Sequence, residues 1–285
     1  MRHETAPSVD QAVLERCLAV LRRAPAGLFT DIDGTICAIA PTPAEAVVTE
    51  AARAALQRLA ARLDFVGVIT GRLASDGAAM VGIPGVTVVG NHGLERRQGD
   101  THWIHPSAAT AVASLTQALD EIRNAAKSAA IDEGLIFEHK HLTASIHYRL
   151  SPQPEAVREH LLALTREAAE RHGLRVTEGR FVIEIRPRVV VNKGTAIVDL
   201  ARERALSGVA YFGDDVTDVD AFVAIRALRE NDGIGTVAVA VLSAETHPSV
   251  AEAADVSVLG VDGCVALLTA LADALEADSS TTTSR

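Results

Sequence analysis

Lysine is scarce in this 285-residue sequence, and positive charge as a whole is outnumbered. Aspartate and glutamate number 37 against 27 for lysine and arginine, which gives a formal net charge of -10. Such a charge repels nucleic acids and anionic membranes unless basic groups cluster locally, so neither is an expected partner. The lysines are Lys127, Lys140 and Lys193. Because lysine is so rare, each of these positions is a candidate for a specific role.

Cysteine and long apolar runs are also scarce. Cys17, Cys37 and Cys264 are odd in number and contain no C-x-x-C pair, which indicates neither a disulfide framework nor a zinc finger. No apolar run approaches the roughly 20 residues that span a bilayer, and residues 1–10 are too polar for a signal peptide. The sequence therefore predicts a soluble cytoplasmic protein, and it leaves the oligomeric state open.

Short apolar runs recur near both ends of the sequence, with helical patterns between them. The runs cover 27–30, 65–69, 86–89, 209–212, 236–241 and 256–259, and the helical patterns cover 8–22, 43–62, 193–204 and 263–276. Strands that are apolar throughout are typical of a parallel sheet buried under helices on both faces. We therefore predict an α/β fold, with a doubly wound parallel-sheet (Rossmann-like) core formed by 1–94 and 189–285. Its Ser- and Thr-rich tail, 277–285, is expected to be disordered.

The middle of the sequence has a different pattern. In 142–150, Ala144, Ile146, Tyr148 and Leu150 fall on one face of a strand, while Ser145, His147 and Arg149 fall on the other. Alternation of this kind is typical of an antiparallel sheet with one buried face, and the helical patterns at 108–127 and 154–172 would cover that face. We therefore predict that 95–188 forms an inserted α+β cap domain.

Two aspartates follow the first predicted strand, in the segment D-I-D-G-T at 31–35. Asp31 and Asp33 lie two residues apart, so both point to the same side as the chain leaves the sheet. The carboxyl ends of parallel strands are where open α/β sheets bind ligands. Two adjacent carboxylates favour a bound cation, and one can attack a substrate while the other transfers protons. The alternative is an ordinary turn, in which aspartate and glycine are common.

A second acidic segment, G-D-D-V-T-D at 213–218, follows the strand predicted at 209–212. If both strands end at the same edge, Asp214 and Asp215 converge on Asp31 and Asp33. Oxygen ligands of this kind suit Mg²⁺, which prefers one or two carboxylates together with water and phosphate. The alternative is a helix cap, with Asp215 or Thr217 as the capping residue and Asp218 facing the helix dipole.

Two further segments complete a potential phosphate site. Thr70-Gly71-Arg72 follows a predicted strand with a hydroxyl group and exposed amides, and Asn192-Lys193-Gly194 puts a lysine at the start of a helix. Each segment alone is compatible with an ordinary turn or an exposed lysine. Their shared position at strand and helix ends is what favours a common site.

In this order, D-I-D-G-T, T-G-R, N-K-G and G-D-D-V-T-D resemble the motifs of the haloacid dehalogenase superfamily of phosphatases. The resemblance implies that Asp31 is the nucleophile that becomes an aspartyl phosphate, and that Asp33 is the general acid and later the base. It implies that Thr70 and Lys193 bind the transferred phosphoryl group.

The same resemblance implies a Mg²⁺ site. Asp214 would join Asp31 and the backbone carbonyl of Asp33 around the metal. Asp215 and Asp218 would support the metal or orient Lys193.

The predicted cap carries polar residues on one face of its sheet, including Glu138, Lys140, Arg149 and Glu184. Such a face can be a solvated surface with charges paired across strands, or it can grip the hydroxyl groups of a sugar, which both donate and accept hydrogen bonds.

A narrower resemblance bears on that choice. The segments G-N-H-G-L-E at 90–95, E-H-K at 138–140, H-Y-R at 147–149 and E-I-R-P at 184–187 are similar to those of trehalose-6-phosphate phosphatases. The similarity implies that Glu138, Lys140, Arg149 and Glu184 hold the glucose units. It also implies substrate contacts from Arg72 and His92.

The hypothesis is therefore a Mg²⁺-dependent phosphatase that converts trehalose 6-phosphate to trehalose. A phosphatase of the same fold acting on another sugar phosphate, such as sucrose 6-phosphate or mannosyl-3-phosphoglycerate, remains open. A non-catalytic sugar-phosphate sensor is disfavoured, because Asp31, Asp33, Lys193 and Asp214 are all retained.

Overall fold

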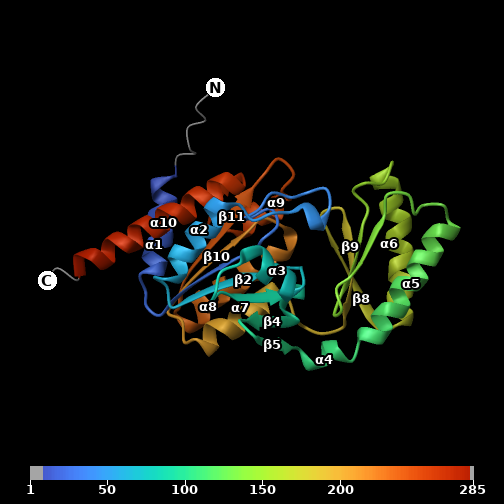
Figure 1. Ribbon diagram of the computed structural model, residues 1–285, viewed down its shortest axis with the longest axis horizontal. Helices are drawn as coiled ribbons and strands as arrows, with labels where there is room; N and C mark the ends of the chain where they lie inside the picture. The colour runs from blue at the N-terminus through green and yellow to red at the C-terminus, as the bar shows by residue number, and fades with distance from the viewer. Residues whose placement is uncertain (1–8, 283–285) are drawn as a thin grey trace, which may run out of the picture. The chain divides into compact units, whose positions relative to one another are not determined.

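The computed structural model describes residues 9–282, and they form two compact units. The first unit combines the chain up to His102 with the chain from Val191 onwards, and the second is Trp103–Val190 (Figure 1). Each unit has its own sheet and its own hydrophobic core. Among the described residues, no helix combines the length and apolar character needed to cross a membrane.

The first unit is built on an eight-stranded sheet, and six of its strands run parallel. The strands, in spatial order, are β12 (Val256–Leu259), β11 (Gly235–Leu242), β10 (Gly208–Gly213), β1 (Ala26–Thr30), β2 (Phe65–Ile69), β3 (Thr87–Gly90), β4 (Glu95–Gln98) and β5 (Thr101–Ile104). The six parallel strands are those predicted from the apolar runs, with ends shifted by at most one residue. The chain starts in the middle of the sheet at β1 and extends to either side, which confirms the doubly wound α/β prediction.

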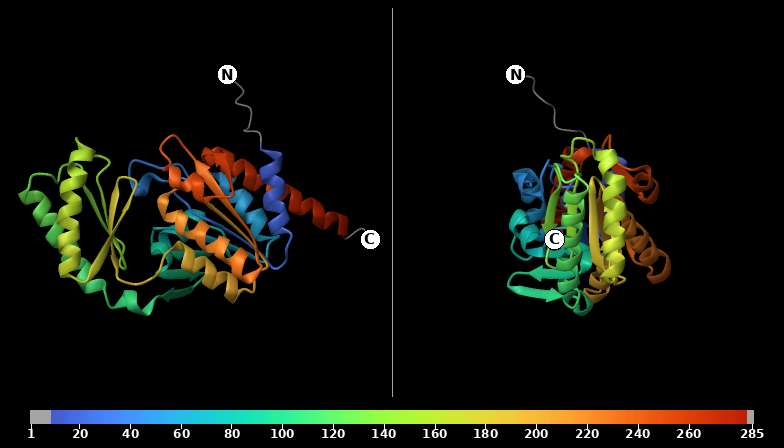
Figure 2. Two further views of the ribbon diagram at one scale, coloured as in Figure 1. Left: turned by 180° about the vertical axis from the view of Figure 1, so that it is seen from behind. Right: turned by 90° about the vertical axis from the view of Figure 1, so that its right-hand side faces the viewer.

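Helices cover both faces of this sheet (Figure 2). One face packs against α1 (Gln11–Leu21), α2 (Glu50–Ala60), α3 (Ala74–Val81) and α10 (Gly260–Thr282), and the other against α7 (Lys193–Glu203), α8 (Val216–Asp232) and α9 (Pro248–Ala253). Successive strand residues point to opposite faces, so Leu28 belongs to one core and Phe29 to the other. This two-sided burial is the reason that β1, β2, β3, β10 and β11 are largely apolar, whereas β12, at the edge of the sheet, is only partly buried.

Two of the helices differ from their sequence predictions. The helix expected over 43–62 is a short 3-10 turn, Pro43–Glu45, followed by α2, whose N-cap is Thr49 and not Thr42. The β-branched residues Val47 and Val48 precede that cap, and such residues favour extended backbone. The helix expected to start at Ser8 is capped by Asp10, and Ser8 lies outside the described residues.

The prediction of a disordered tail from 277 is wrong as far as residue 282, because α10 continues to Thr282. Arg22 at the end of α1 forms an ion pair with Asp278, with Nε 2.8 Å from Oδ2. This contact, distant in sequence, fixes a segment whose composition alone favours disorder. Residues 283–285 of the predicted tail lie outside the described residues.

The second unit contains an antiparallel sheet of four strands with two long helices on one face. In spatial order the strands are β6 (Ile136–His139), β7 (Ala144–His147), β9 (Val182–Pro187) and β8 (Leu174–Gly179), and the helices are α5 (Val112–Ser128) and α6 (Pro154–Arg171). A short helix, α4 (Pro106–Ala109), precedes α5, so the helix predicted over 108–127 is two helices. Ala144, Ile146 and Tyr148 pack in this core, as the alternation predicted, whereas Leu150 lies beyond the end of β7 and is 50% exposed.

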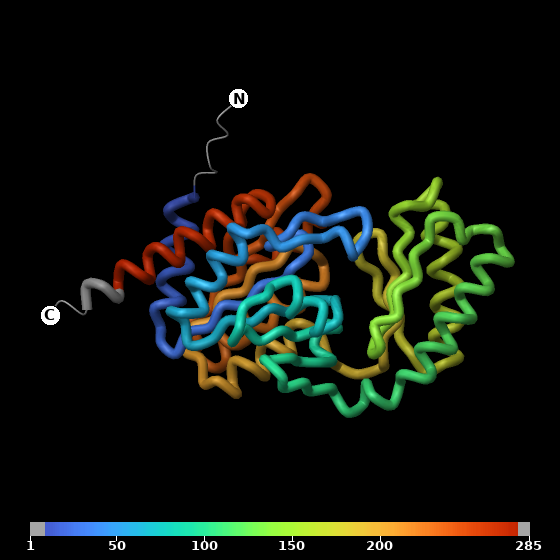
Figure 3. The backbone as a smooth tube through the Cα atoms, viewed as in Figure 1, coloured from blue at the N-terminus to red at the C-terminus, as the bar shows by residue number. Residues whose placement is uncertain are grey.

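The boundary of the insert differs from the prediction. We expected it to begin at Glu95, but β4 and β5 belong to the sheet of the first unit, where β4 pairs antiparallel with β3 (Figure 3). The two units divide within β5, so that the second unit begins at Trp103, and it ends at Val190. The prediction failed because the sequence of β4, Glu95-Arg96-Arg97-Gln98, is too polar to suggest a strand of this sheet. Polar residues are tolerated in β4 because it lies near the edge of the sheet.

Candidate active site

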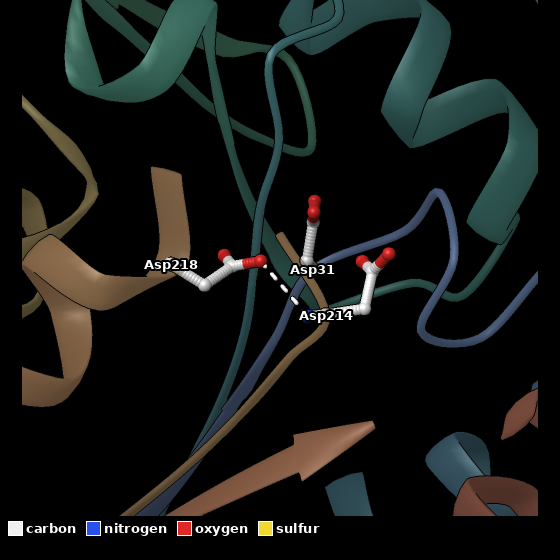
Figure 4. A group of neighbouring side chains, drawn as sticks. All are labelled: Asp31, Asp214 and Asp218. Atoms are coloured by element: carbon white, nitrogen blue, oxygen red, sulfur yellow. Dashed lines mark hydrogen bonds between the residues drawn. The ribbon is translucent and has the colours of Figure 1, made fainter. Parts of the chain in front are cut away.

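Three aspartates gather where β1 and β10 end. Asp31 follows β1, Asp214 follows β10, and Asp218 lies in the first turn of α8 (Figure 4). One carboxylate oxygen from each lies within 4.8 Å of the others, and all three side chains are buried. The two strands are parallel neighbours, which is why segments far apart in sequence meet here.

Lys193 links two of these carboxylates. Its Nζ lies 2.8 Å from Oδ2 of Asp31 and 2.6 Å from Oδ1 of Asp218, and the side chain is 2% exposed. Burial by itself would lower the pKa of Lys193, but the charges of Asp218 and Asp31 outweigh it and raise the pKa above its usual range. The ammonium group is therefore charged and held in place.

Lys193 is the first residue of α7, and the helix start fixes where its side chain begins. Asn192 caps the helix by accepting a hydrogen bond from the backbone N–H of Thr195, 2.9 Å away, while Thr195 Oγ1 accepts one from the N–H of Asn192. This reciprocal cap satisfies two donors that a helix start leaves unpaired.

Asp218 is surrounded by donors. Its Oδ1 accepts hydrogen bonds from Lys193 and from the hydroxyl of Tyr211, and its Oδ2 accepts from the backbone N–H groups of Asp214 and Asp215, each 3.0 Å away. Four donors occupy the lone pairs of this carboxylate, so its geometry suits holding Lys193 and the turn at 213–215 better than binding a metal.

The carboxylates of Asp31 and Asp214 accept fewer hydrogen bonds than that of Asp218. Asp31 Oδ1 accepts from the N–H of Ile32 at 2.7 Å, and Asp214 Oδ1 accepts from Thr35 Oγ1 at 3.1 Å. A Cβ at Gly34 would lie 1.9 Å from Asp214 Oδ2, so a glycine is needed for the two segments to approach this closely.

The electrostatics of the two aspartates favour a bound cation. Burial, followed by the charges of Asp218 and Asp31, raises the pKa of Asp214 to about 9. Burial is also the main cause that raises the pKa of Asp31 to about 7, against the opposing effect of Lys193. A divalent cation would relieve this cost, and an all-oxygen donor set is what Mg²⁺ prefers. The residues present therefore fit a hard divalent metal.

The side chains of Asp33 and Asp215 lie outside the cluster of Asp31, Asp214 and Asp218. Asp33 forms a two-pronged ion pair with Arg72, with Nε to Oδ2 and NH2 to Oδ1 both at 2.7 Å. Arg72 NH1 also donates to the backbone carbonyl of Pro43, 2.8 Å away. Asp215 is the N-cap residue of α8, which agrees with the helix-cap alternative. Asp214, in contrast, lies in the cluster with Asp31.

The predicted residues Thr70 and His92 lie in segments that contact each other. Thr70 follows β2 and is buried, and its Oγ1 accepts a hydrogen bond from the N–H of Arg72 at 3.2 Å. His92 is also buried, and its N–H donates to the carbonyl of Thr70 at 2.9 Å.

The second unit has its own polar cluster, formed by Glu138, Lys140, Ser145, His147 and Glu184. Lys140 Nζ lies 3.4 Å from Oε1 of Glu184 and 3.7 Å from Oε2 of Glu138. Ser145 donates to Glu184 at 3.1 Å, and His147 Nε2 lies 3.1 Å from Glu138. Lys140 and Glu184 are only 6% and 7% exposed. These two residues are therefore more buried than the alternative of a solvated surface predicts.

Arg149, predicted with this cluster, makes a different contact. Its guanidinium lies over the ring of Phe181, with 4.6 Å between Cζ and the ring centroid. The strand β7 ends at His147, so strand alternation no longer fixes the direction of Arg149.

Comparison with known proteins identifies the family. A family model described as trehalose-phosphatase matches residues 29–259. The chain belongs to the trehalose-phosphatase family. It is 39% identical over 238 residues to trehalose-phosphate phosphatase of Mycobacterium marinum, a match that covers 79% of this chain and 59% of that one. It is also 39% identical over 209 residues to the protein of the same name from Mycobacterium tuberculosis strain H37Rv, covering 71% of this chain and 52% of that one. The chain thus matches between half and three fifths of the length of these relatives.

Solved structures share the fold of this trehalose-phosphatase family member. The C-terminal domain of trehalose-6-phosphate phosphatase from C. albicans superposes with a TM-score of 0.77 at 22% identity, covering 95% of this chain and 99% of that one. A protein described as related to trehalose-6-phosphate phosphatase gives a TM-score of 0.68 at 23% identity, covering 87% of this chain and 98% of that one. At these identities the likeness extends to the fold, a core with an inserted antiparallel sheet.

Several residues that surround the site were not among those predicted from the sequence. Tyr211 lies within an apolar strand and reads as a core residue, although its hydroxyl donates to Asp218. Thr35 lies inside the D-I-D-G-T motif, and its position two residues after Asp33 was the available signal. Ser145 alternates correctly for the polar face of its strand, but nothing in the sequence pairs it with Glu184.

Proposed function

We propose that the protein hydrolyses trehalose 6-phosphate to trehalose and phosphate through an aspartyl phosphate on Asp31. The observation that carries the proposal is the position of Asp31, 2.8 Å from Lys193 and beside Asp214, in a chain of the trehalose-phosphatase family. A nucleophile, a fixed cation and a second carboxylate are the groups that a phosphoryl transfer from a sugar requires.

Lys193 and the turns around it prepare the site for a dianion. A phosphate ester approaches a carboxylate only when positive groups offset the repulsion, and the Lys193 ammonium is fixed at Asp31 before substrate arrives. Thr70, buried at the end of β2, offers a hydroxyl for a phosphate oxygen. Mg²⁺ held by Asp31 and Asp214 would supply further charge compensation for the phosphoryl oxygens.

Asp33 carries the proton transfers in this proposal. As the acid it protonates the leaving sugar oxygen, and as the base it deprotonates the water that hydrolyses the aspartyl phosphate. General acid catalysis of this kind contributes about 10²–10⁴-fold. Two hydrogen bonds from Arg72 orient the carboxylate of Asp33.

The polar cluster of the second unit supplies sugar recognition. Glu138 and Glu184 offer acceptors and Lys140 offers donors, and a sugar hydroxyl uses both. Arg149, with its guanidinium on Phe181, and His92 and Arg72 complete the proposed substrate contacts. The class of ligand assigned to this cluster is a disaccharide with free hydroxyl groups.

Phosphate release from a panel of sugar phosphates in the presence of Mg²⁺ tests the substrate. We expect trehalose 6-phosphate to give the highest kcat/KM, ahead of sucrose 6-phosphate, mannosyl-3-phosphoglycerate and glucose 6-phosphate. A strong preference for a monosaccharide phosphate would defeat the trehalose assignment while leaving the reaction type intact.

The covalent step is tested by Asp31→Asn. We expect this variant to bind trehalose 6-phosphate and to release no phosphate, because an amide is not a competent nucleophile. Robust turnover by Asp31→Asn would sink the aspartyl-phosphate mechanism. The proposal of Mg²⁺ is tested by chelation, which we expect to abolish turnover until Mg²⁺ is returned.

A further inference from the structure

A carboxylate outside the proposed catalytic set lies where three segments of the first unit meet. Glu95 is the first residue of β4, and its side chain is buried. Its Oε1 accepts hydrogen bonds from the backbone N–H of Ala74 at 3.0 Å and from Nδ2 of Asn91 at 2.6 Å. Its Oε2 lies 2.8 Å from Nε2 of His102 on β5. One side chain therefore connects the start of α3, the turn after β3 and the hairpin of β4 and β5.

The turn after β3 needs such a connection because its backbone is strained. Asn91 and His92 have φ values of 48° and 56°, so two consecutive residues other than glycine occupy the left-handed region. This conformation costs free energy at each residue and persists only where the surroundings hold it. The contact of the Asn91 side chain with Glu95 is a charge-assisted hydrogen bond, the stronger class of such bonds.

The strained turn holds the segment 70–72 through backbone hydrogen bonds, and we call this segment the phosphate-binding loop. The N–H of Asn91 donates to the carbonyl of Arg72 at 2.7 Å, and the N–H of His92 donates to the carbonyl of Thr70 at 2.9 Å. A Cβ at Gly71 would lie 2.6 Å from Nε2 of His92, so the imidazole packs directly on this glycine. The position of the turn therefore determines the position of the loop.

Glu95 also acts on the other side of the loop. Ala74, whose N–H donates to Glu95, is the first residue of α3, and only Leu73 separates it from the loop. Close packing supports this contact, because a Cβ at Gly90 would lie 2.3 Å from the backbone nitrogen of Ala74. The loop thus lies between two groups, Asn91 and Ala74, that share the same carboxylate oxygen.

We propose that Glu95 is a positioning residue of the active site, which fixes the phosphate-binding loop through Asn91 and Ala74. The role of the loop in holding phosphate rests on the proposed function, whereas the mechanical connection does not. Misplacing a group that binds the reacting phosphoryl by about 1 Å costs on the order of 10²-fold in rate. Removing Glu95 is therefore expected to lower turnover although Glu95 touches no substrate.

The first experiment measures hydrogen–deuterium exchange and needs no turnover. Glu95→Ala removes the shared acceptor, so we expect amides in peptides covering 70–75 and 90–95 to exchange at least about tenfold faster. Glu95→Gln keeps an oxygen for Ala74 and Asn91 and is expected to retain wild-type protection. A peptide from β11, which β10, β1 and β2 separate from β3 in the sheet, is the internal control and should not change. Wild-type exchange of both segments in Glu95→Ala would overturn the proposal.

The second experiment compares two substrates of the same variants. The phosphoryl group is common to trehalose 6-phosphate and p-nitrophenyl phosphate, so Glu95→Ala should lower kcat/KM for both by a similar factor of about 10–100-fold. Glu95→Gln should stay within about threefold of wild type. A loss confined to trehalose 6-phosphate would contradict positioning of the phosphate-binding loop, because it would place the effect at the sugar.

Two further variants keep the test decisive. His102→Ala removes the Oε2 partner alone and should retain at least about half of wild-type turnover, since both loop contacts use Oε1. Asn91→Gly tolerates the positive φ and removes the Nδ2 donor, so it should accelerate exchange of 70–75 even if Glu95→Ala fails to fold. Wild-type exchange in Asn91→Gly would also overturn the proposal. If the wild-type protein hydrolyses neither substrate, the proposed function fails, and the exchange rates still decide the role of Glu95.

Discussion

Each unit of the protein buries one lysine among carboxylates, and the two sites differ in how tightly the lysine is held. In the first unit, Lys193 Nζ lies 2.8 Å from Asp31 and 2.6 Å from Asp218. In the second unit, Lys140 Nζ lies 3.4 Å from Glu184 and 3.7 Å from Glu138. Ordinary N–H···O hydrogen bonds span about 2.7–3.2 Å, so the contacts of Lys140 are looser.

The difference matches the two tasks that we propose. A group that stabilises charge in a transition state works best when it is fixed before the reaction, because no reorganisation is then needed. A group that recognises sugar hydroxyls has to exchange its protein contacts for ligand contacts, which is easier when those contacts are long. The third lysine, Lys127, is exposed on α5 and offers a control for both.

Replacing Lys193 should have the largest effect. Lys193→Met leaves the buried carboxylates of Asp31 and Asp218 without their cation, and breaking a buried pair in this way costs about 3–5 kcal/mol of folding free energy. We expect turnover to fall by at least about 10²–10³-fold on every phosphate ester. Chemical denaturation and phosphate release measure the two effects. Lys127→Met should change neither, and near-normal turnover in Lys193→Met would refute the role of the fixed ammonium.

Replacing Lys140 should impair sugar recognition by the second unit without impairing the chemistry of the first unit. Lys140→Met removes donors to the sugar but leaves the phosphoryl site intact, so KM for trehalose 6-phosphate should rise about tenfold or more, the equivalent of roughly 1.4 kcal/mol. The kcat for p-nitrophenyl phosphate should stay within about twofold of wild type. Steady-state kinetics on both substrates give the answer. Equal losses on both would mean that Lys140 does not act through the sugar.

The pH dependence of stability should reveal the aspartates of the first unit. Raised pKa values near 7 for Asp31 and near 9 for Asp214 mean that the folded state binds these protons more tightly than the unfolded state. The contribution of these two groups to the free energy of unfolding of the metal-free protein should therefore be highest at about pH 4 and fall as the pH rises through about 7 to 9. Denaturation in a chelator across this range measures the fall.

Mg²⁺ and a variant provide controls for this pH dependence. Mg²⁺ binds the ionised carboxylates, so its stabilising effect should grow with pH. Asp214→Asn removes one titrating group and should flatten the upper part of the profile. A profile that rises between about pH 7 and 9 without metal would contradict this assignment of the buried charges.

Removing the hydroxyl of Tyr211 should have the smallest effect. Tyr211→Phe keeps the buried ring, which packs edge-on against Phe222, and deletes one of four donors to Asp218. We expect a loss of about 1 kcal/mol in the free energy of unfolding and a fall of a few-fold in kcat, because Lys193 remains paired. Thermal unfolding and steady-state kinetics measure both. An effect as large as that of Lys193→Met would mean that the site depends on Tyr211 more than its geometry indicates.

Much of the fold was predictable because its signals are local. Five of the six parallel strands are largely apolar and buried on both faces, and the strand around Ile146 alternates and is buried on one face, so the pattern of apolar residues indicates the kind of burial. Features set by distant contacts were not predictable. The hairpin of β4 and β5 joins the first sheet through β3, and α10 extends to Thr282 beside an ion pair between Arg22 and Asp278.

The same division applies to the site. The sequence by itself determined that Asp31 and Asp214 approach one another, since both follow strands that end at one edge of a parallel sheet, but it did not place Asp218 in their cluster. Only the tertiary structure decided which atoms pair. Arg72 holds Asp33 across 39 residues, and Lys193 reaches Asp31 across 162. Hydrogen bonds depend on distances of a few tenths of an ångström, and these are fixed by packing of the whole core and not by any local pattern.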